Sequence, residues 1–400
     1  VKESLPWLTM AKPRISYAIT GNDAIEQNRY GYLDQVSVSG GGPIGYLGYT
    51  TTETAFGNSN LKPESIKKYN VGLDLGFANQ LSLSVDFFKE TMDDGVYRST
   101  SLIPSYQGIS LGAFPAINFA EYENKGYEVE LKYMKRFNKD WSFNLGGSVS
   151  YNKNKIINVG ETPNDEDYAY PYRTQGYPVG QNFGYLVDFS NGNGMYNFQE
   201  EIDAGPTYSF GTARLGDLKY KDLNGDGIID EKDQAPIGNG SLPRYFYGIS
   251  GGFTYKNLEL SFLFQGVADY HRNFYGLAVN ESAWEGRFSE SHLTAWNEER
   301  WLNDEKITYP ALSKSRSVNA EFSDVFQKNC SFVRIKNLEV VYSLPAKTAN
   351  AIGAKSFKVI LGGQNLFTID KLKSKDMVVE GNYGDFPIYR MYRIGVRAQF

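Results

Sequence analysis

The 400-residue sequence contains one cysteine, Cys330, and two histidines, His271 and His292. A single cysteine excludes an internal disulfide and any zinc site built from cysteines. Two histidines leave almost no material for a histidine-rich zinc site or a catalytic triad. We therefore interpret both histidines as loop or wall residues and expect no catalytic residues.

Long apolar runs and basic blocks are also missing. No apolar run reaches the roughly 18 residues that a membrane-spanning helix needs. The formal net charge is -5, with acidic and basic residues interspersed, so we expect no nucleic-acid partner. The first residues, Val1 to Pro6, lack the basic and apolar regions of a signal peptide. For a secreted protein, this absence implies a processed or truncated chain.

Aromatic residues and glycine are abundant, with 30 Tyr, 25 Phe and 41 Gly. They occur in segments where apolar and polar residues alternate over about ten residues, the length of a tilted membrane strand. Such a strand has one face toward lipid and one toward a water-filled lumen. The apolar sets are Val71/Leu73/Leu75/Phe77, Leu81/Leu83/Val85/Phe87, Tyr127/Val129/Leu131/Tyr133, Phe143/Leu145/Gly147/Val149/Tyr151, Leu258/Leu260/Phe262/Phe264 and Phe357/Val359/Leu361/Gly363.

The connections between these segments are of two kinds. Short turns are expected at 79–80, 138–140 and 256–257, and long loops at 157–176, 190–212 and 268–328, with a short helix at 290–302. Tight turns at one end and large loops at the other are typical of outer-membrane barrels. A soluble β-sandwich or propeller also has alternating strands, but its strands average only about five or six residues.

The C-terminus is itself an alternating segment, Tyr392 to Phe400, that ends on an aromatic residue. A barrel has no free edge, so its last strand must close on its first. A chain that stops at the end of a strand fits this requirement, and the pattern is similar to the insertion signal of outer-membrane barrels.

Several motifs resemble, in order, those of the SusC-type (SusC/RagA) TonB-dependent outer-membrane importers. Residues 216–222, Gly-Asp-Leu-Lys-Tyr-Lys-Asp, lead through Asp233 to Pro236-Ile237-Gly238. The other matching stretches are Pro13–Asn22, Asn60–Glu64 with Tyr69–Asp74, Asn124–Glu128, Tyr177–Gln181 with Phe183–Tyr185, Phe332–Leu338, Tyr342–Pro345 and Gly363–Phe367. The resemblance implies that residues 1–400 form the C-terminal part of an all-β, transmembrane antiparallel β-barrel with long extracellular loops. We expect roughly a dozen strands, counted at about ten residues for each strand. The resemblance implies that the plug domain and TonB-contacting segment of the family lie outside this chain.

The resemblance also implies a function. Family members import oligosaccharides or peptides across the bacterial outer membrane, and act with a SusD-like surface lipoprotein and a TonB complex. Outer-membrane lipid is a further expected partner, and no enzyme activity is expected. A passive porin and an outer-membrane barrel enzyme remain as alternatives.

One segment has the ligand spacing of a calcium loop. Side-chain oxygens and one backbone carbonyl fall at the required positions, and Gly227 occupies the sharp turn. We therefore predict a structural Ca²⁺, although the last position carries Asp rather than Glu. The alternative is a turn whose side chains satisfy its own backbone. The predicted ligands are Asp222, Asn224, Asp226, the Ile228 carbonyl, Asp230 and Asp233.

Two further patterns have simpler interpretations. Residues 248–252, Gly-Ile-Ser-Gly-Gly, fit the nucleophile-elbow pattern but lie in an expected strand with no following helix. Trp284, Trp296 and Trp301 lie in the longest loop, where they can stack on a sugar, pack the loop, or anchor at the membrane interface. We favour the last two roles.

Overall fold

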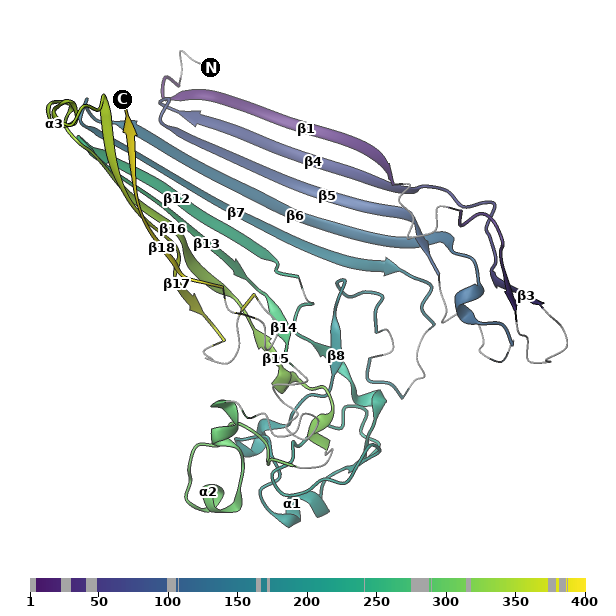
Figure 1. The fold of residues 1–400 in the computed structure, drawn as a ribbon. Coiled ribbons are helices and arrows are strands. Elements are labelled where there is room, and N and C mark those ends of the chain that lie inside the picture. Colours follow the sequence, from purple (N-terminus) through teal and green to yellow (C-terminus); the bar gives the residue numbers. More distant parts are fainter. Residues whose placement is uncertain are drawn as a thin grey trace.

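The computed structural model describes residues 5–22, 30–40, 49–98, 106, 108–162, 167–170, 173–240, 242–274, 288, 290–313, 318–372, 379–380, 386 and 388–400. Its main feature is a ten-stranded antiparallel sheet (Figure 1). In spatial order the strands are β1 (Leu8–Asn22), β4 (Glu64–Phe77), β5 (Leu81–Tyr97), β6 (Ile117–Arg136), β7 (Trp141–Asn158), β12 (Tyr245–Tyr255), β13 (Leu258–Ala268), β16 (Phe332–Ser343), β17 (Ser356–Asp370) and β18 (Met391–Gln399).

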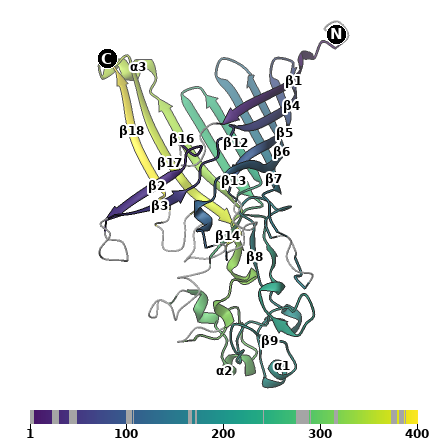
Figure 2. The same ribbon diagram turned by 90° about the vertical axis from the view of Figure 1, so that its right-hand side faces the viewer.

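Each strand of this sheet pairs with the long strand that follows it in the chain. Short turns and the helix α3 (Ala346–Ala351) lie at the end that also carries the N and C labels in Figure 1. The long connections leave from the opposite end. Figure 2 shows that the sheet curves, so that β1 and β18 form the two sides of an open trough. The predicted turns and alternating segments are therefore confirmed, with ten long strands in the described residues where roughly a dozen were expected.

The pairing places the predicted apolar residues on one face of the sheet. Leu83 lies opposite Leu75 on one side and Leu131 on the other, and Phe262 lies opposite Gly251 and Leu338. Because side chains alternate along a strand, the residues between them form a polar face. The sheet has no second sheet packed against its apolar face in the described part of the chain, so a sandwich is excluded.

Two rows of aromatic rings border the apolar face. The row toward the long loops, the loop-side belt, includes Tyr127 stacked on Tyr151 with ring centroids 5.4 Å apart. Its members are Tyr17, Tyr69, Phe87, Tyr127, Tyr151 and Tyr245. The turn-side belt contains Trp7, Phe77, Tyr133, Trp141, Phe143, Phe253 and Tyr255. Aromatic girdles at both membrane interfaces are typical of outer-membrane barrels.

The pairing of the sheet has several register shifts, and the one within β16 lies at Lys336. Ile335 pairs with Phe264 and Asn337 with Leu263, so Lys336 is an extra residue relative to β13. Toward β17, the same residue faces two residues, Asn365 and Leu366. This bulge places Val333 and Ile335 on the same face as Leu338 and Val340, although Ile335 and Leu338 are three positions apart, an odd offset that would put them on opposite faces of a regular strand.

The long connections fold into a compact unit at the loop end, which we call the loop domain (residues 182–240, 290–313 and 318–331). It has its own core of buried residues, and Tyr196 and Leu218 have no exposed surface. Its elements are β8 (Asn182–Gly184), η3 (Phe189–Asn191), α1 (Gln199–Asp203), β9 (Thr207–Tyr208), β10 (Ile228–Ile229), η4 (Glu231–Asp233), β11 (Ala235–Ile237), η5 (Glu290–Thr294), α2 (Glu298–Leu302), η6 (Val318–Ala320), η7 (Asp324–Phe326) and β15 (Gln327–Asn329). β14 (His271–Asn273) pairs with β15 and links the loop domain to β13.

Three remaining elements lie away from the loop domain. They are β2 (Gln35–Gly40), β3 (Tyr49–Ala55) and η2 (Leu111–Ala113). The helix expected at 290–302 is two short turns, η5 and α2, separated by Ala295–Asn297, because the Asn297 side chain caps α2 by accepting from the Arg300 amide. No helix in the described residues is long and apolar enough to cross a membrane.

Phe400 continues the outward row of β18, and 77% of its surface is exposed. We expect Phe400→Asp to reduce the amount of membrane-inserted protein several-fold, since a charge replaces an apolar ring on the membrane-facing side. The measurement is heat-modifiable mobility of the outer-membrane fraction. Gln399→Asp, on the adjacent inward position, is the control and should assemble normally. Equal assembly of wild type and Phe400→Asp would contradict the prediction.

Candidate functional site

An arginine on β1 is bound by two carboxylates on the polar face. The Arg14 guanidinium donates to Asp74 on β4 over 3.0 and 2.8 Å, and to Asp86 on β5 over 2.9 and 2.8 Å. Ser84 donates to Asp74 over 2.7 Å. Gly72 lies between Arg14 and Asp86 in the sheet, where a Cβ would come within 2.5 Å of the Asp86 carboxylate. The glycine therefore leaves the room that this contact needs.

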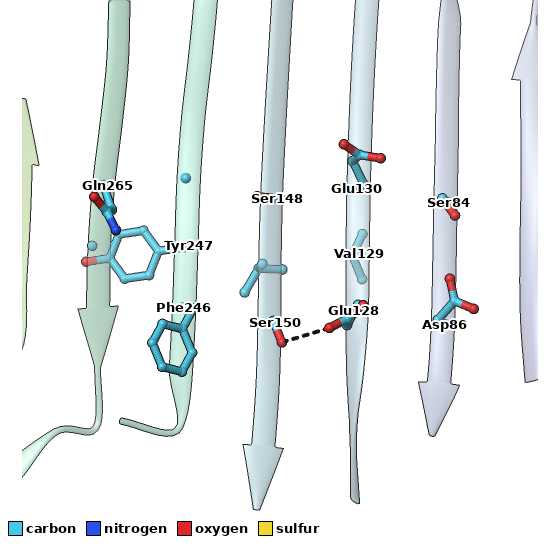
Figure 3. Close-up of a pocket in the computed structure, with 13 residues that line it drawn as sticks. Ser84, Asp86, Glu128, Val129, Glu130, Ser148, Ser150, Phe246, Tyr247 and Gln265 are labelled. Carbon is cyan, nitrogen blue, oxygen red and sulfur yellow. Dashed lines mark hydrogen bonds between the residues drawn. The ribbon is translucent and has the colours of Figure 1, made fainter. Parts of the chain in front are cut away.

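Beside this cluster the polar face is hollowed by a cavity of about 480 Å³ (Figure 3). It extends from β5 across β6, β7 and β12 to β13. Its lining is rich in carboxylates and hydroxyls, with two aromatic rings and one amide. The labelled side chains that carry these groups are Ser84, Asp86, Glu128, Glu130, Ser148, Ser150, Phe246, Tyr247 and Gln265.

The carboxylates of the cavity differ in their partners. Asp86 is neutralised by Arg14, and Glu130 lies 2.7 Å from Lys132. Glu128 accepts a hydrogen bond from the Ser150 hydroxyl over 3.4 Å, and no cationic side chain of the described residues lies within 4.0 Å of it. The cavity thus presents hydrogen-bond acceptors and hydroxyls to a polar solute. This lining resembles a polar binding surface.

The predicted calcium ligands fall in the loop domain, between β9 and the short helix η4. Asp222 accepts from the Gly225 and Gly227 amides over 2.7 and 2.8 Å, and Asp226 accepts from the Ile228 amide over 2.8 Å. The Asn224 side chain accepts from the Asp226 amide over 3.1 Å. The turn is therefore closed by its own side chains.

The last two predicted ligands form a capping box on η4. Asp233 is fully buried and accepts from the Leu223 and Asp230 amides, while Asp230 accepts from the Lys232 amide. Burial raises the pKa of the Asp233 carboxyl. In the described residues, no three His, Cys, Asp or Glu side chains are grouped so as to hold a metal ion. As folded here, the loop therefore matches a self-satisfied turn, and Ca²⁺ stays a prediction.

The loop domain is held together by contacts between its two halves. The buried Asp217 carboxylate accepts from the Asn319 side chain over 2.8 Å, and Asn319 in turn accepts from the Leu218 amide over 2.7 Å. Burial raises the pKa of Asp217. The Trp296 indole donates to Asn197 over 3.0 Å. Residues about a hundred positions apart are thereby fixed in one core.

The tryptophans, the histidines and the elbow-like motif singled out in the sequence lie as follows. Trp296 is buried in the loop-domain core and Trp301 packs against it, whereas Trp284 lies outside the described residues. His271 lies in β14 and His292 in η5. Ser250 of the elbow-like motif lies in the middle of β12, opposite Gly146 and Leu263, and not at a strand-to-helix turn.

Sequence reasoning missed Arg14, Asp74, Ser84 and Asp86. The short turn after β4 sets the pairing of Phe77 with Leu81, and this pairing already places Asp74 opposite Ser84. No local pattern indicated which residues Arg14 would face. A long connection separates β1 from β4, so no short turn sets the register of that pair.

Comparisons with known proteins agree with this architecture. Residues 6–301 match the family model described as TonB dependent receptor-like, beta-barrel. The chain is 26% identical to TonB-dependent receptor P3 of Formosa agariphila over 98% of its own length and 40% of that protein. It is also 26% identical to TonB-dependent receptor SusC of Bacteroides thetaiotaomicron, over 98% of the chain and 38% of that protein.

Among solved structures, the fold is similar to one chain of the RagAB peptide importer in its open-open state. The TM-score is 0.71 at 21% identity, over 98% of this chain and 40% of that one. The chain thus spans about two fifths of the length of the relatives that it matches. With its outward apolar band, aromatic belts and polar trough, the chain belongs to the TonB dependent receptor-like β-barrel family of the bacterial outer membrane.

Proposed function

We propose that this chain forms part of the wall of a TonB-dependent importer for nutrients too large for passive pores, namely oligosaccharides or peptides. The observation that carries the proposal is the polar, hollowed inner face of a sheet whose outer face is apolar. Such a wall encloses an aqueous path through lipid. The family match supports active import rather than passive diffusion.

The cavity on β5–β13 supplies the chemistry expected of such a path. Sugar hydroxyls and peptide amides donate hydrogen bonds, and the Glu128 carboxylate, the serine hydroxyls and the Gln265 amide accept them. Phe246 offers an apolar surface beside these groups. We propose that passing substrate contacts this lining.

The proposed partners are a SusD-like surface lipoprotein at the loop end and a TonB complex on the periplasmic side. The similar RagAB protein is a peptide importer, and SusC of Bacteroides thetaiotaomicron is one of the similar receptors. The SusC-type resemblance of the sequence motifs supports the pairing with a lipoprotein. The loop domain supplies the surface at that end, because its folded core gives a partner a fixed shape to recognise.

Uptake measurements test the proposal. Cells that carry the importer would be given labelled oligosaccharides or labelled peptides, with and without an intact TonB complex. We expect accumulation of one class that stops when TonB is deleted. Uptake that continues without TonB would instead identify a passive porin, and uptake of neither class would reject the proposed substrates.

We also propose that the 222–233 loop takes up Ca²⁺. Each carboxylate oxygen has two lone pairs, so an oxygen that accepts a backbone amide can still bind a cation. We expect chelator treatment, and separately Asp226→Ala, to raise the protease sensitivity of residues 216–240 several-fold while the sheet stays intact. Glu200→Ala, on the exposed helix α1, is the control and should behave like wild type. Unchanged sensitivity after chelation would leave the loop as a turn only.

A further inference from the structure

Five lysines gather on the outward face of β4–β7, and we call them the lysine row. Lys89, Lys125 and Lys153 lie directly opposite one another on β5, β6 and β7. Lys67 and Lys155 lie one step further toward the loops, in line with Thr91 and Glu123 of the strands between them. The row therefore crosses four adjacent strands on two neighbouring levels.

The position of the row relative to the aromatic belt is fixed by the sheet register. Lys89 follows Phe87 by two residues, and Lys125 precedes Tyr127 by two, so these lysines share the face of the loop-side belt. Two residues of strand span about 7 Å. On β5, β6 and β7 the row thus lies just beyond the belt on the loop side, and on β4 it adjoins Tyr69, which lies opposite Lys89. This is the level where lipid headgroups meet the barrel.

The charges of the row are only partly compensated. Glu123 lies 2.7 Å from Lys89 and 3.2 Å from Lys125, so one carboxylate serves two ammonium groups. Lys67 is paired with Asp93 over 2.6 Å. The ammonium groups of Lys67, Lys89 and Lys125 therefore share two carboxylates.

Lys153 and Lys155 add two positive charges to the row. Both are exposed, and no Asp or Glu of the described residues lies within 4.0 Å of either ammonium group. Even when Glu121 at the outer end of β6 is added, three carboxylates face five lysines. Like charges directly opposite each other destabilise a sheet pair, so the arrangement favours an external anion.

We propose that the lysine row binds phosphate groups of the lipids in the outer leaflet. The loops of outer-membrane barrels face outward, which places the row in that leaflet. The row adjoins the membrane-facing apolar band and carries positive charge. Both properties suit a phosphorylated lipid headgroup as its ligand. Lysine stems can lie along the apolar surface while their ammonium groups reach the headgroups. The inference rests on the membrane position of the sheet and not on the proposed import.

The test compares lipid binding by the intact purified importer and by the triple variant Lys89→Gln, Lys125→Gln, Lys153→Gln. The probes are diphosphorylated lipid A and the same lipid without phosphates, each in uncharged detergent. One lysine near an anionic surface contributes about fivefold in affinity, so three should contribute roughly 100-fold. We expect this loss for the phosphorylated lipid alone, and weaker wild-type binding at high salt.

The control is the double variant Lys132→Gln, Lys135→Gln. Lys132 is on the polar face, and Lys135 is at the turn end of the apolar face beside the Phe137 ring, so this variant should bind within twofold of wild type. Heat-modifiable mobility checks folding, and if the triple variant fails to fold, Lys153→Gln alone should lose about fivefold. Equal binding by wild type and variant, or equal binding of both lipids by wild type, would overturn the proposal.

Discussion

Replacing Leu83 by arginine is expected to destabilise the inserted sheet by about 2–4 kcal/mol, the cost of an arginine on the lipid face near the bilayer midplane. Leu83 lies between the two aromatic belts, flanked by Leu75 and Leu131 on the neighbouring strands. These flanking side chains are apolar, so they offer the guanidinium no acidic partner. The measurement is an unfolding titration of the purified protein in lipid, monitored by heat-modifiable mobility.

Ser261→Arg is the matched control for this variant. Ser261 is exposed on the polar face of β13, opposite Gly252 and Glu339, where an arginine can reach water. We expect its unfolding midpoint to stay close to that of wild type. If both variants lost the same stability, the assignment of the two faces would be wrong.

Replacing Gly216 by alanine is expected to unfold the loop domain locally while the sheet remains. Gly216 has φ +80°, and a Cβ there would come within 2.4 Å of the Trp296 ring and 2.6 Å of the Ala311 Cβ. The left-handed backbone costs an alanine about 1–2 kcal/mol, and overpacking of a close-packed core costs about 1–3 kcal/mol more.

Gly225→Ala separates these two contributions. Gly225 has φ +78°, but nothing lies within 4 Å of its added Cβ. We expect this control to lose only the backbone share, about 1–2 kcal/mol. Hydrogen exchange of the loop domain measures both losses. The amide proton of residue 216, which is bonded to the Tyr196 carbonyl, and that of Ala311, which is bonded to the carbonyl of residue 216, should exchange much faster in Gly216→Ala alone. Equal losses in both variants would remove the packing argument.

The sheet was predictable because its signals are local. Alternation at Val71–Phe77 and Leu81–Phe87 predicts two strands, and a turn between them leaves one register that keeps both apolar sets on one face. The polar partners Asp74 and Ser84 then follow without further information. The same logic gives the hairpins around 138–140 and 256–257.

The loop domain could not be predicted in this way. Its core joins Tyr185 and Tyr220 to Phe326, and Asp217 to Asn319, over long sequence separations that no local period encodes. Its elements are only two to five residues long, so neither helix nor strand periodicity can develop. Segment 190–212 therefore looked like a loop, whereas its Tyr196 and Tyr208 are core residues that share a hydrogen bond. The calcium motif remains a prediction for a related reason: spacing along the chain does not determine whether oxygens point at a cation or at the turn's own amides.

The bulge at Lys336 divides β16 into two reading frames. Residues 332–335 place odd-numbered side chains outward, and residues 337–343 place even-numbered ones outward. One residue inserted or deleted at the bulge would exchange the inward and outward side chains of residues 332–335. The side chains of residues 337–343 would keep their faces. One lost residue between Leu338 and Tyr342 would instead turn part of the apolar row inward. We expect length variation among natural relatives of this strand to concentrate at the bulge.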